Sequence, residues 1–313
     1  MFLFETRNYG FNEIIKQYAR FPWYLSLPAH FEHGWSPAIL DTDLSTKKPL
    51  MLVFSKRKAS DWQKVSEIPV AVIGSPFRLF RKLNHIRQKE NARGTVVFPA
   101  HSTYGIKNHF EVDKYCKELK QLPEKFQPIT ICLFWHDFVD KSSDIYRQNG
   151  FRVVSAGRKF TIGLNFVRNF YEILSSHKYS SSNEIGSHTF YAVDFGLPFF
   201  LLGRRPSARR VKKGHKLYPM ANFKFGRLAE KLFDTGPVIR ISPEQKAFVN
   251  QETGASDCLT RDELAAILKE NNKTYLSLAK TLHFHFESLA LRFVFNGPWG
   301  RAAIAIRKKM IKG

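Results

Sequence analysis

Short apolar segments alternate with longer segments of helical pattern over most of the chain, and this alternation limits the possible folds more than any other feature. In the second half, apolar runs of strand length lie at 95–99, 129–135, 151–155 and 197–202, and a further short strand is expected at 179–181. The segments between them that can form helices are 111–122, 142–149, 163–176 and 186–195. Strands regularly separated by helices of about 8–15 residues are typical of a parallel, doubly wound sheet. The sequence therefore predicts an α/β fold.

The first part of the chain repeats this pattern on a smaller scale. A candidate strand ends the segment 23–32, further candidates cover 50–54 and 70–73, and a basic amphipathic helix is expected over 77–89. Apolar runs of this length between polar segments are typical of short strands. The first part therefore predicts a second α/β unit.

A charged segment at 88–94 separates the two parts and ends in a glycine, which is typical of a break between domains. The 313 residues are enough for two domains of ordinary size. We therefore expect one domain over residues 1–90, a second over 94–280, and a C-terminal helix with a basic tail over 281–313. The predicted architecture is two Rossmann-like domains that face a cleft.

The formal net charge of +22 favours an anionic partner. Nucleic acid, an anionic bilayer surface and a phosphorylated substrate all meet this requirement, and charge alone does not choose among them. The 29 phenylalanines suit base stacking or membrane-interface docking, and they equally suit an apolar core. The basic segment 204–216 is expected to form a loop that covers a ligand, lies on anionic lipid or is simply solvated.

The cysteine count and the chain start bear on the compartment. Cys116, Cys132 and Cys258 are odd in number and have no paired spacing, which argues against a disulfide framework and a thiolate metal site. We expect no secretory signal, because no small-residue cleavage site follows the first apolar patch. No segment reaches the roughly 20 apolar residues of a membrane span. A reducing, cytoplasmic location is therefore expected.

A turn after the candidate strand at 179–181 carries the first candidate site. Gly186, Ser187, His188 and Thr189 open the next helix. A helix amino end offers free N–H groups and a partial positive charge, so it can bind phosphate. The Ser187 and Thr189 hydroxyls could add hydrogen bonds, and Gly186 allows close backbone approach. Ordinary N-capping by serine and threonine explains the same residues.

A histidine follows a candidate strand in the first part, within the sequence Glu32, His33, Gly34, Trp35. In an α/β domain this position faces the crevice where ligands bind. Histidine has a suitable pKa to take a proton from a hydroxyl at neutral pH. Gly34 leaves room for the acceptor molecule that carries this hydroxyl. The alternative is a histidine satisfied by local hydrogen bonds.

Two further polar groups follow strands of the second part. His101, Ser102 and Thr103 come after the strand at 95–99, and His136 comes after the strand at 129–135. Their side chains could donate to phosphate oxygens. Because the carboxyl ends of parallel strands share one edge, these residues should converge with the helix that Gly186 opens.

Several other chemistries lack their motifs. The chain has no Walker loop, no G-x-G-x-x-G and no G-x-S-x-G nucleophile elbow. His283 and His285 alternate within a helical stretch and so point two ways, which disfavours zinc. We therefore expect no metal site.

The order of these motifs resembles the GT-B glycosyltransferases, and within them the CDP-glycerol glycerophosphotransferase-like family of teichoic-acid and capsule enzymes. The family's motifs are W-H-G-T, Gly-x-Pro-Arg, Ala-Pro-Thr, His-Pro and Asp-Tyr-Ser-Ser. Their closest counterparts here are Glu32-His33-Gly34-Trp35, Gly74-Ser75-Pro76-Phe77-Arg78, Pro99-Ala100-His101-Ser102-Thr103, Trp135-His136-Asp137 and Asn183-Glu184-Ile185-Gly186-Ser187. The resemblance covers roughly residues 25–203.

The resemblance implies a nucleotide-sugar-dependent, Leloir-type glycosyltransferase of GT-B fold. Metal is not required if the helix end and the histidines neutralise the leaving phosphates, and we expect no cofactor. The resemblance also implies His33 as the base on the acceptor hydroxyl and a donor-diphosphate contact at Ser187, His188 and Thr189. Gly74 and Ser75 would lie on the acceptor side with the residues around His33. The donor would be CMP-, CDP- or UDP-linked, carrying a sugar or glycerol phosphate.

The implied acceptor is a bacterial surface polysaccharide, such as capsule, lipopolysaccharide or teichoic acid, or a lipid-linked precursor. The enzyme would act on the cytoplasmic face of the cell membrane, with peripheral contact to anionic lipid and no nucleic-acid partner. Three alternatives remain open at this point. They are a basic nucleic-acid-binding protein, a non-catalytic glycan-assembly factor that keeps the fold, and a nucleotide-sugar epimerase.

Overall fold

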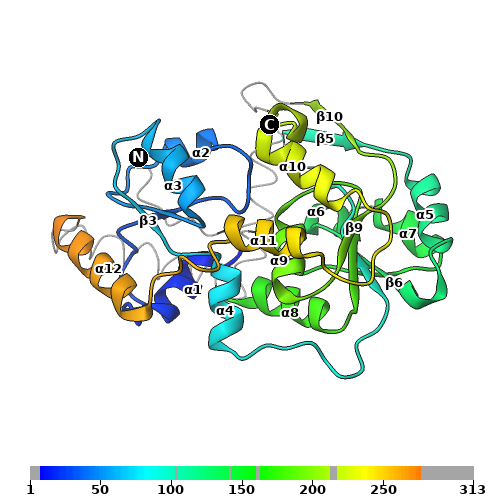
Figure 1. Cartoon of the computed structure of the whole chain (residues 1–313), viewed down its shortest axis with the longest axis horizontal. Helices are drawn as coiled ribbons and strands as arrows, with labels where there is room; N and C mark the ends of the chain where they lie inside the picture. The colour runs from blue at the N-terminus through cyan, green and yellow to red at the C-terminus, as the bar shows by residue number, and fades with distance from the viewer. Residues whose placement is uncertain (1–7, 103–104, 141, 160–162, 212–216, 276–313) are drawn as a thin grey trace, which may run out of the picture.

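Two parallel sheets form the centre of the protein (Figure 1). The structure is a computed structural model that describes residues 8–102, 105–140, 142–159, 163–211 and 217–275. The smaller sheet has the order β1-β2-β3, with β1 at His30–Phe31, β2 at Met51–Val53 and β3 at Val70–Val72. All of its strand pairs are parallel.

The larger sheet has the order β7-β6-β4-β8-β9, and its pairs are also parallel. Its strands are β4 (Thr95–Val97), β6 (Ile129–Cys132), β7 (Arg152–Val154), β8 (Tyr179–Ser182) and β9 (Phe199–Leu201). The chain first builds outward from β4 through β6 to β7, and then crosses to the other side at β8. In a doubly wound sheet, the reversal between β4 and β8 marks the edge where ligands bind.

Helices connect and cover the strands. Those along the larger sheet are α5 (Val112–Lys120), α6 (Trp135–Val139), α7 (Ser142–Gln148), α8 (Asn165–Ser175), α9 (Ser187–Phe195) and α10 (Lys224–Phe233). The smaller sheet has α2 (Asp41–Leu44) and α3 (Lys56–Gln63), and α4 (Pro76–Leu83) follows β3. Two short 3-10 turns lie at Glu124–Phe126 and Met220–Asn222.

One continuous apolar cluster joins the two sheets. It includes Leu52 of β2, Phe77 of α4, Val96 of β4 and Phe190 of α9. Phe77 stacks on Tyr191 with a centroid separation of 4.3 Å. Burial of large aromatic rings is worth several kcal/mol each by area, so this shared core fixes the two sheets against one another.

The chain returns to the smaller sheet after completing the larger one. The helix α11 (Pro243–Glu252) packs on α9, and α12 (Arg261–Tyr275) lies beside α1 (Phe11–Tyr18) in Figure 1. Tyr18 Oη donates to the Leu259 carbonyl at 2.9 Å, and Arg261 Nε donates to the Tyr18 carbonyl at 2.9 Å. The segment 253–261 therefore returns the chain from α11, beside the larger sheet, to α1.

The predicted α/β class with parallel sheets is confirmed, while several local predictions are wrong. The helix expected over 77–89 ends at Leu83, and His85 has a left-handed φ of 51°. Trp135 does not end a strand; it begins α6. Part of the basic segment 204–216 is a strand, because β10 (Ser207–Arg210) pairs antiparallel with β5 (Ile106–His109).

Some predictions lie outside the described residues. These are Thr103, the pair His283 and His285, and the tail 281–313. Within the described part of the chain, no helix combines the length and the apolar character needed to cross a bilayer.

Candidate functional site

Polar loops from three strands meet at the carboxyl edge of the larger sheet. The His101 ring stacks on Phe134 at 4.4 Å between centroids, and Phe134 lies 5.4 Å from the His136 ring. The loop after β8 joins them, because the His101 main-chain N–H donates to the Glu184 carboxylate. The structure thus brings together the groups after β4, β6 and β8, as parallel strands require.

Asn183, at the end of β8, holds these loops in place. Its side chain is fully buried. Its Oδ1 accepts from the Ala100 N–H at 2.8 Å, and its Nδ2 donates to the Arg204 carbonyl at 3.4 Å. A buried amide with both ends satisfied fixes the segments that it joins. One signal of this role is visible in the sequence, where the predicted strand ends in the polar run 180–183.

His33 approaches the same edge from the smaller sheet. It follows β1 and is half-buried, and its Nε2 lies 2.5 Å from Lys159 Nζ. Lys159 follows β7 of the larger sheet, and its carbonyl accepts from the Tyr9 N–H at 2.8 Å. His33 Nδ1 lies 2.8 Å from the Asn8 side-chain amide. Sequence reasoning missed Asn8 and Lys159, because neither follows a strand directly within a recognised motif.

The proton positions around His33 follow from counting donors. A lysine ammonium has only donors, so Nε2 must be the acceptor in the contact with Lys159. Neutral imidazole then carries its proton on Nδ1, which must donate to an oxygen. Asn8 Oδ1 is buried and otherwise lacks a hydrogen-bond partner, and amide oxygen and nitrogen are assigned from the hydrogen-bond network. We therefore assign Nδ1–H donating to Asn8 Oδ1.

Burial shifts the pKa values of the basic groups. Desolvation, followed by the nearby Lys159 charge, lowers the pKa of His33 to about 4. Desolvation lowers the pKa of Lys159 to about 8 and, with help from His101, that of His188 to about 3. Burial also lowers the pKa of His101. These histidines are therefore neutral at pH 7.

The acidic groups shift in the opposite direction for the same reason. Burial raises the pKa of Glu184 to about 7 and that of Asp137 to about 6. The Asp137 carboxylate accepts from the Ser102 main-chain N–H, which ties the loops after β4 and β6. Clusters of titratable groups with shifted pKa values are typical of functional sites.

Two of the expected phosphate donors have other hydrogen-bonding roles. His101 Nδ1 lies 3.3 Å from the Ser102 carbonyl, and the His188 ring bonds the Glu184 carbonyl. Each contact takes the single N–H of a neutral imidazole and leaves Nε2 as an acceptor. His188 Nε2 is buried and has no partner. His101 therefore suits a hydroxyl group of a ligand better than a phosphate oxygen, whereas the buried His188 Nε2 exposes no surface to a ligand.

The hydroxyls at the start of α9 are used within the protein. Ser187 Oγ accepts from the Trp35 N–H at 3.0 Å and donates to the Trp35 carbonyl at 3.4 Å. Thr189 is fully buried, and its Oγ1 accepts from the Gly186 N–H at 3.3 Å. In this structure the two hydroxyls join a loop and cap a helix, and phosphate binding by Ser187 and Thr189 stays a prediction.

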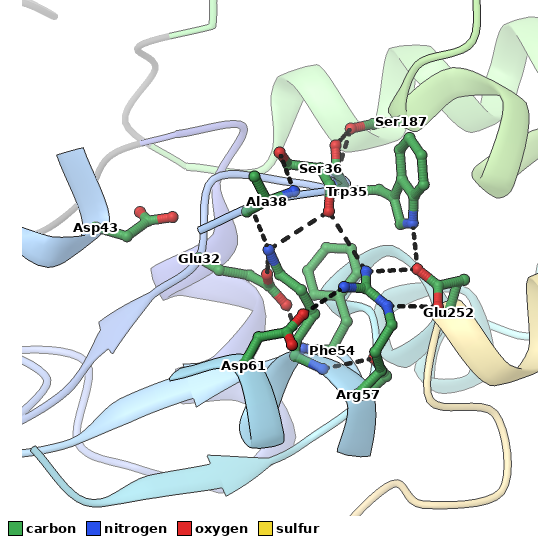
Figure 2. Close-up of polar contacts among 12 residues, drawn as sticks. Glu32, Trp35, Ser36, Ala38, Asp43, Phe54, Arg57, Asp61, Ser187 and Glu252 are labelled. Atoms are coloured by element: carbon green, nitrogen blue, oxygen red, sulfur yellow. Dashed lines mark hydrogen bonds and ion pairs between the residues drawn. The ribbon is translucent and has the colours of Figure 1, made fainter. Parts of the chain in front are cut away.

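Trp35 is the centre of a buried clamp between the two units (Figure 2). Its indole N–H donates to Glu252 Oε2 at 2.7 Å, and its ring stacks on Phe190 at 4.0 Å. Glu252 also accepts from Arg57 Nε at 2.7 Å and Nη2 at 2.6 Å, so the guanidinium is held by two bonds. The clamp residues Trp35, Arg57, Ser187 and Glu252 come from the β1–α2 loop, α3, α9 and α11.

The remaining residues predicted for the acceptor side also have structural contacts, and their contact with an acceptor stays a prediction. Glu32 is buried, accepts from the Phe54 N–H at 2.5 Å and pairs with Lys58 at 3.1 Å, so it braces the smaller sheet. Gly34 has φ 76°, and a Cβ there would lie 2.8 Å from Ser187 Oγ. Gly34 therefore permits the contact with α9.

Gly74 and Ser75 hold the returning chain. Gly74 has φ 75°, and a Cβ there would overlap Cys258 Sγ. Ser75 is buried, and its N–H donates to the Thr253 carbonyl at 3.0 Å. Both residues serve the packing of the segment after α11.

Comparisons with known proteins give only a distant structural resemblance. No protein-family model matches the chain, and no curated protein matches it significantly. The wall teichoic acid polymerase TagF superposes with a TM-score of 0.40 and 10% identity, over 73% of this chain and 59% of that chain. The Glycosylation Associate Protein (Gap123) complex from Streptococcus agalactiae gives 0.37 and 12%, over 71% and 45%. The GtfA/B complex gives 0.33 and 14%, over 78% and 53%.

This chain therefore spans less than two thirds of the length of each of these three chains. The similarity concerns the α/β architecture, and the chemistry of the site has to be argued from this chain's own residues.

Proposed function

We propose that this protein is a GT-B glycosyltransferase that moves a sugar, or glycerol phosphate, from a nucleotide-activated donor to a surface glycan or a lipid-linked acceptor. The observation that carries the proposal is the meeting of His33 and Lys159, 2.5 Å apart, from the carboxyl edges of two parallel sheets. A base supplied by one sheet and a cation supplied by the other match the needs of group transfer between two substrates.

The donor would lie on the edge of the larger sheet. The amino end of α9 favours negative charge, and Lys159 adds a full positive charge, so the phosphates of the leaving nucleotide would bind there. The exposed His136 lies at the same edge. His101 would accept a hydrogen bond from a hydroxyl of the nucleotide or the sugar. Fixed groups that stabilise the departing charge supply the main catalytic effect.

His33 would act on the acceptor hydroxyl. In glycosyl transfer, the acceptor oxygen forms a bond to the anomeric carbon while the bond from that carbon to the phosphate oxygen breaks. The hydroxyl proton passes to His33 Nε2, and the phosphate oxygen leaves with the electron pair. Asn8 holds Nδ1–H, which keeps the Nε2 lone pair directed at the site.

The first test is a thermal-shift panel with CMP, CDP, UDP and GDP. One nucleotide should raise the melting temperature, because a ligand at 100 times its Kd adds about 2.7 kcal/mol of stability. The matching transfer assay should show that His33→Ala abolishes transfer and keeps nucleotide binding. Retained turnover would remove His33 from the role of base.

The other outcomes separate the alternatives. Salt-steep nucleic-acid binding with no response to nucleotides would favour a nucleic-acid-binding protein. Nucleotide stabilisation without transfer would favour a non-catalytic assembly factor, and turnover of a UDP-sugar without acceptor would favour an epimerase. Peripheral contact with anionic membrane on the cytoplasmic face stays a prediction, to be checked by sedimentation with anionic vesicles.

A further inference from the structure

The nitrogen of His33 that should take the acceptor's proton is occupied by Lys159. His33 Nε2 and Lys159 Nζ lie 2.5 Å apart. The ammonium can only donate, so it uses the lone pair that a general base needs. In this arrangement His33 has no lone pair available for a substrate hydroxyl.

Charged and titratable groups of the described residues surround the pair. Asp43 of α2 is the carboxylate that acts on both His33 and Lys159, and it is itself 3.0 Å from His30 Nε2. Lys159 also acts electrostatically on His101 at the edge of the larger sheet. Among the described residues, the titratable and charged groups around the pair include Asp43, His30, His101 and Tyr9, whose ring centroid is 5.8 Å from Lys159 Nζ.

We propose that Lys159 is a ligand of the donor's phosphates and that it releases His33 when it binds them, so that donor binding makes the base available. This inference rests on the proposed function. A charge-assisted bond from the ammonium to a phosphate is stronger than a bond to a neutral imidazole, so an arriving diphosphate draws Lys159 away from Nε2. The empty protein then holds its base in a blocked state.

The release also makes His33 a better base. The protonated imidazole becomes more favourable for two reasons. His33 Nε2 loses the hydrogen bond from Lys159, and phosphate neutralises the Lys159 charge. The pKa of His33 then moves up toward the usual value of about 6.5, which is closer to the operating pH. The acceptor hydroxyl therefore reacts only after the donor has bound, and its proton goes to Nε2 while Lys159 stays with the departing phosphates.

The test is an NMR titration of His33 in the full-length protein labelled with ¹⁵N-histidine, with His33→Gln used for assignment. Without ligand, His33 should protonate well below the usual midpoint of about 6.5. Saturating CDP, UDP or inorganic pyrophosphate should raise the midpoint by at least about one pH unit. This titration needs no variant at Lys159, so its result can be interpreted even if Lys159 variants fold poorly.

Lys159→Met supplies the second arm. It should raise the His33 midpoint in the empty protein, remove the further effect of diphosphate and weaken diphosphate binding at least about tenfold. The matched control is Lys125→Met, which removes the same charge beside Phe126, ahead of β6. The control should leave both the midpoint and the affinity unchanged.

Two negative outcomes are distinguishable. If a diphosphate binds and raises the melting temperature while the His33 midpoint stays fixed, the coupling is wrong and the proposed function stands. If neither these three probes nor CMP and GDP bind, the proposed function and the coupling both fail.

Discussion

The clamp around Glu252 offers a test of how the two units are held together. Glu252→Gln removes the negative charge and keeps the side-chain volume. The Glu252 side chain is 0% exposed and its partner Arg57 is 7% exposed, so neither charge can turn to water. Removing one partner of such a pair typically costs about 3–5 kcal/mol. The remaining contact of Arg57 with Asp61, at 2.9 Å, offsets a part of that cost.

We therefore expect Glu252→Gln to lower the free energy of unfolding by about 2–4 kcal/mol, since bonds to charged groups contribute about 1.5–3 kcal/mol each. The measurement is urea unfolding followed by tryptophan fluorescence. The matched control is Glu172→Gln, because Glu172 pairs with Lys89 on the surface and its side chain is 67% exposed. Exposed pairs are worth about 0–1 kcal/mol.

A double-mutant cycle with Arg57→Met sharpens the result. The two single changes should show a coupling of at least about 1 kcal/mol, because each alone leaves a buried partner unsatisfied. Equal losses from Glu252→Gln and Glu172→Gln, together with zero coupling to Arg57, would refute the idea that the clamp holds the units together.

Three further predictions follow from the site. Ser187→Ala should cost about 1 kcal/mol by losing its bonds to Trp35 and leave nucleotide affinity within about twofold, as calorimetry can check. Nucleotide affinity should fall as pH rises through about 7, because Glu184 then ionises and repels phosphate; Glu184→Gln should flatten this profile in the same calorimetry. Gly74→Ala should lower the melting temperature, because φ 75° is strained for alanine and the new Cβ would overlap Cys258 Sγ.

Helices and strands were predicted correctly from the sequence where their hydrophobic pattern lies within the segment itself. The buried runs β4, β6 and β9 and the amphipathic α8 follow from periodicity alone, because burial acts on each segment separately. The strand β10 was missed, because its partner β5 lies about 100 residues earlier and its four residues are all exposed. An exposed strand has no apolar alternation to reveal it.

For the candidate site, the ends of the predicted strands indicated the sheet edge at which polar residues gather. They could not indicate whether each side chain bonds a ligand or another part of the protein. Ser187 and Thr189 have the residue types of a phosphate loop, yet their hydroxyls bond Trp35 and Gly186. Lys159 could not be predicted as a site residue, because it meets His33, which lies 126 residues earlier in the chain. A hydroxyl or ammonium has the same local pattern whether its partner is a ligand or a distant loop.

The positive charge of the protein and its neutral histidines have a common physical basis. A net charge of +22 attracts anionic ligands, and it also opposes the addition of further protons to the chain. At the sheet edge, desolvation adds to this opposition, and Lys159 itself lowers the pKa of both His33 and His101. An anion bound to Lys159 would offset that part of the effect on both histidines. If phosphate binds at this edge, as we propose, its binding should be coupled to proton uptake by His33.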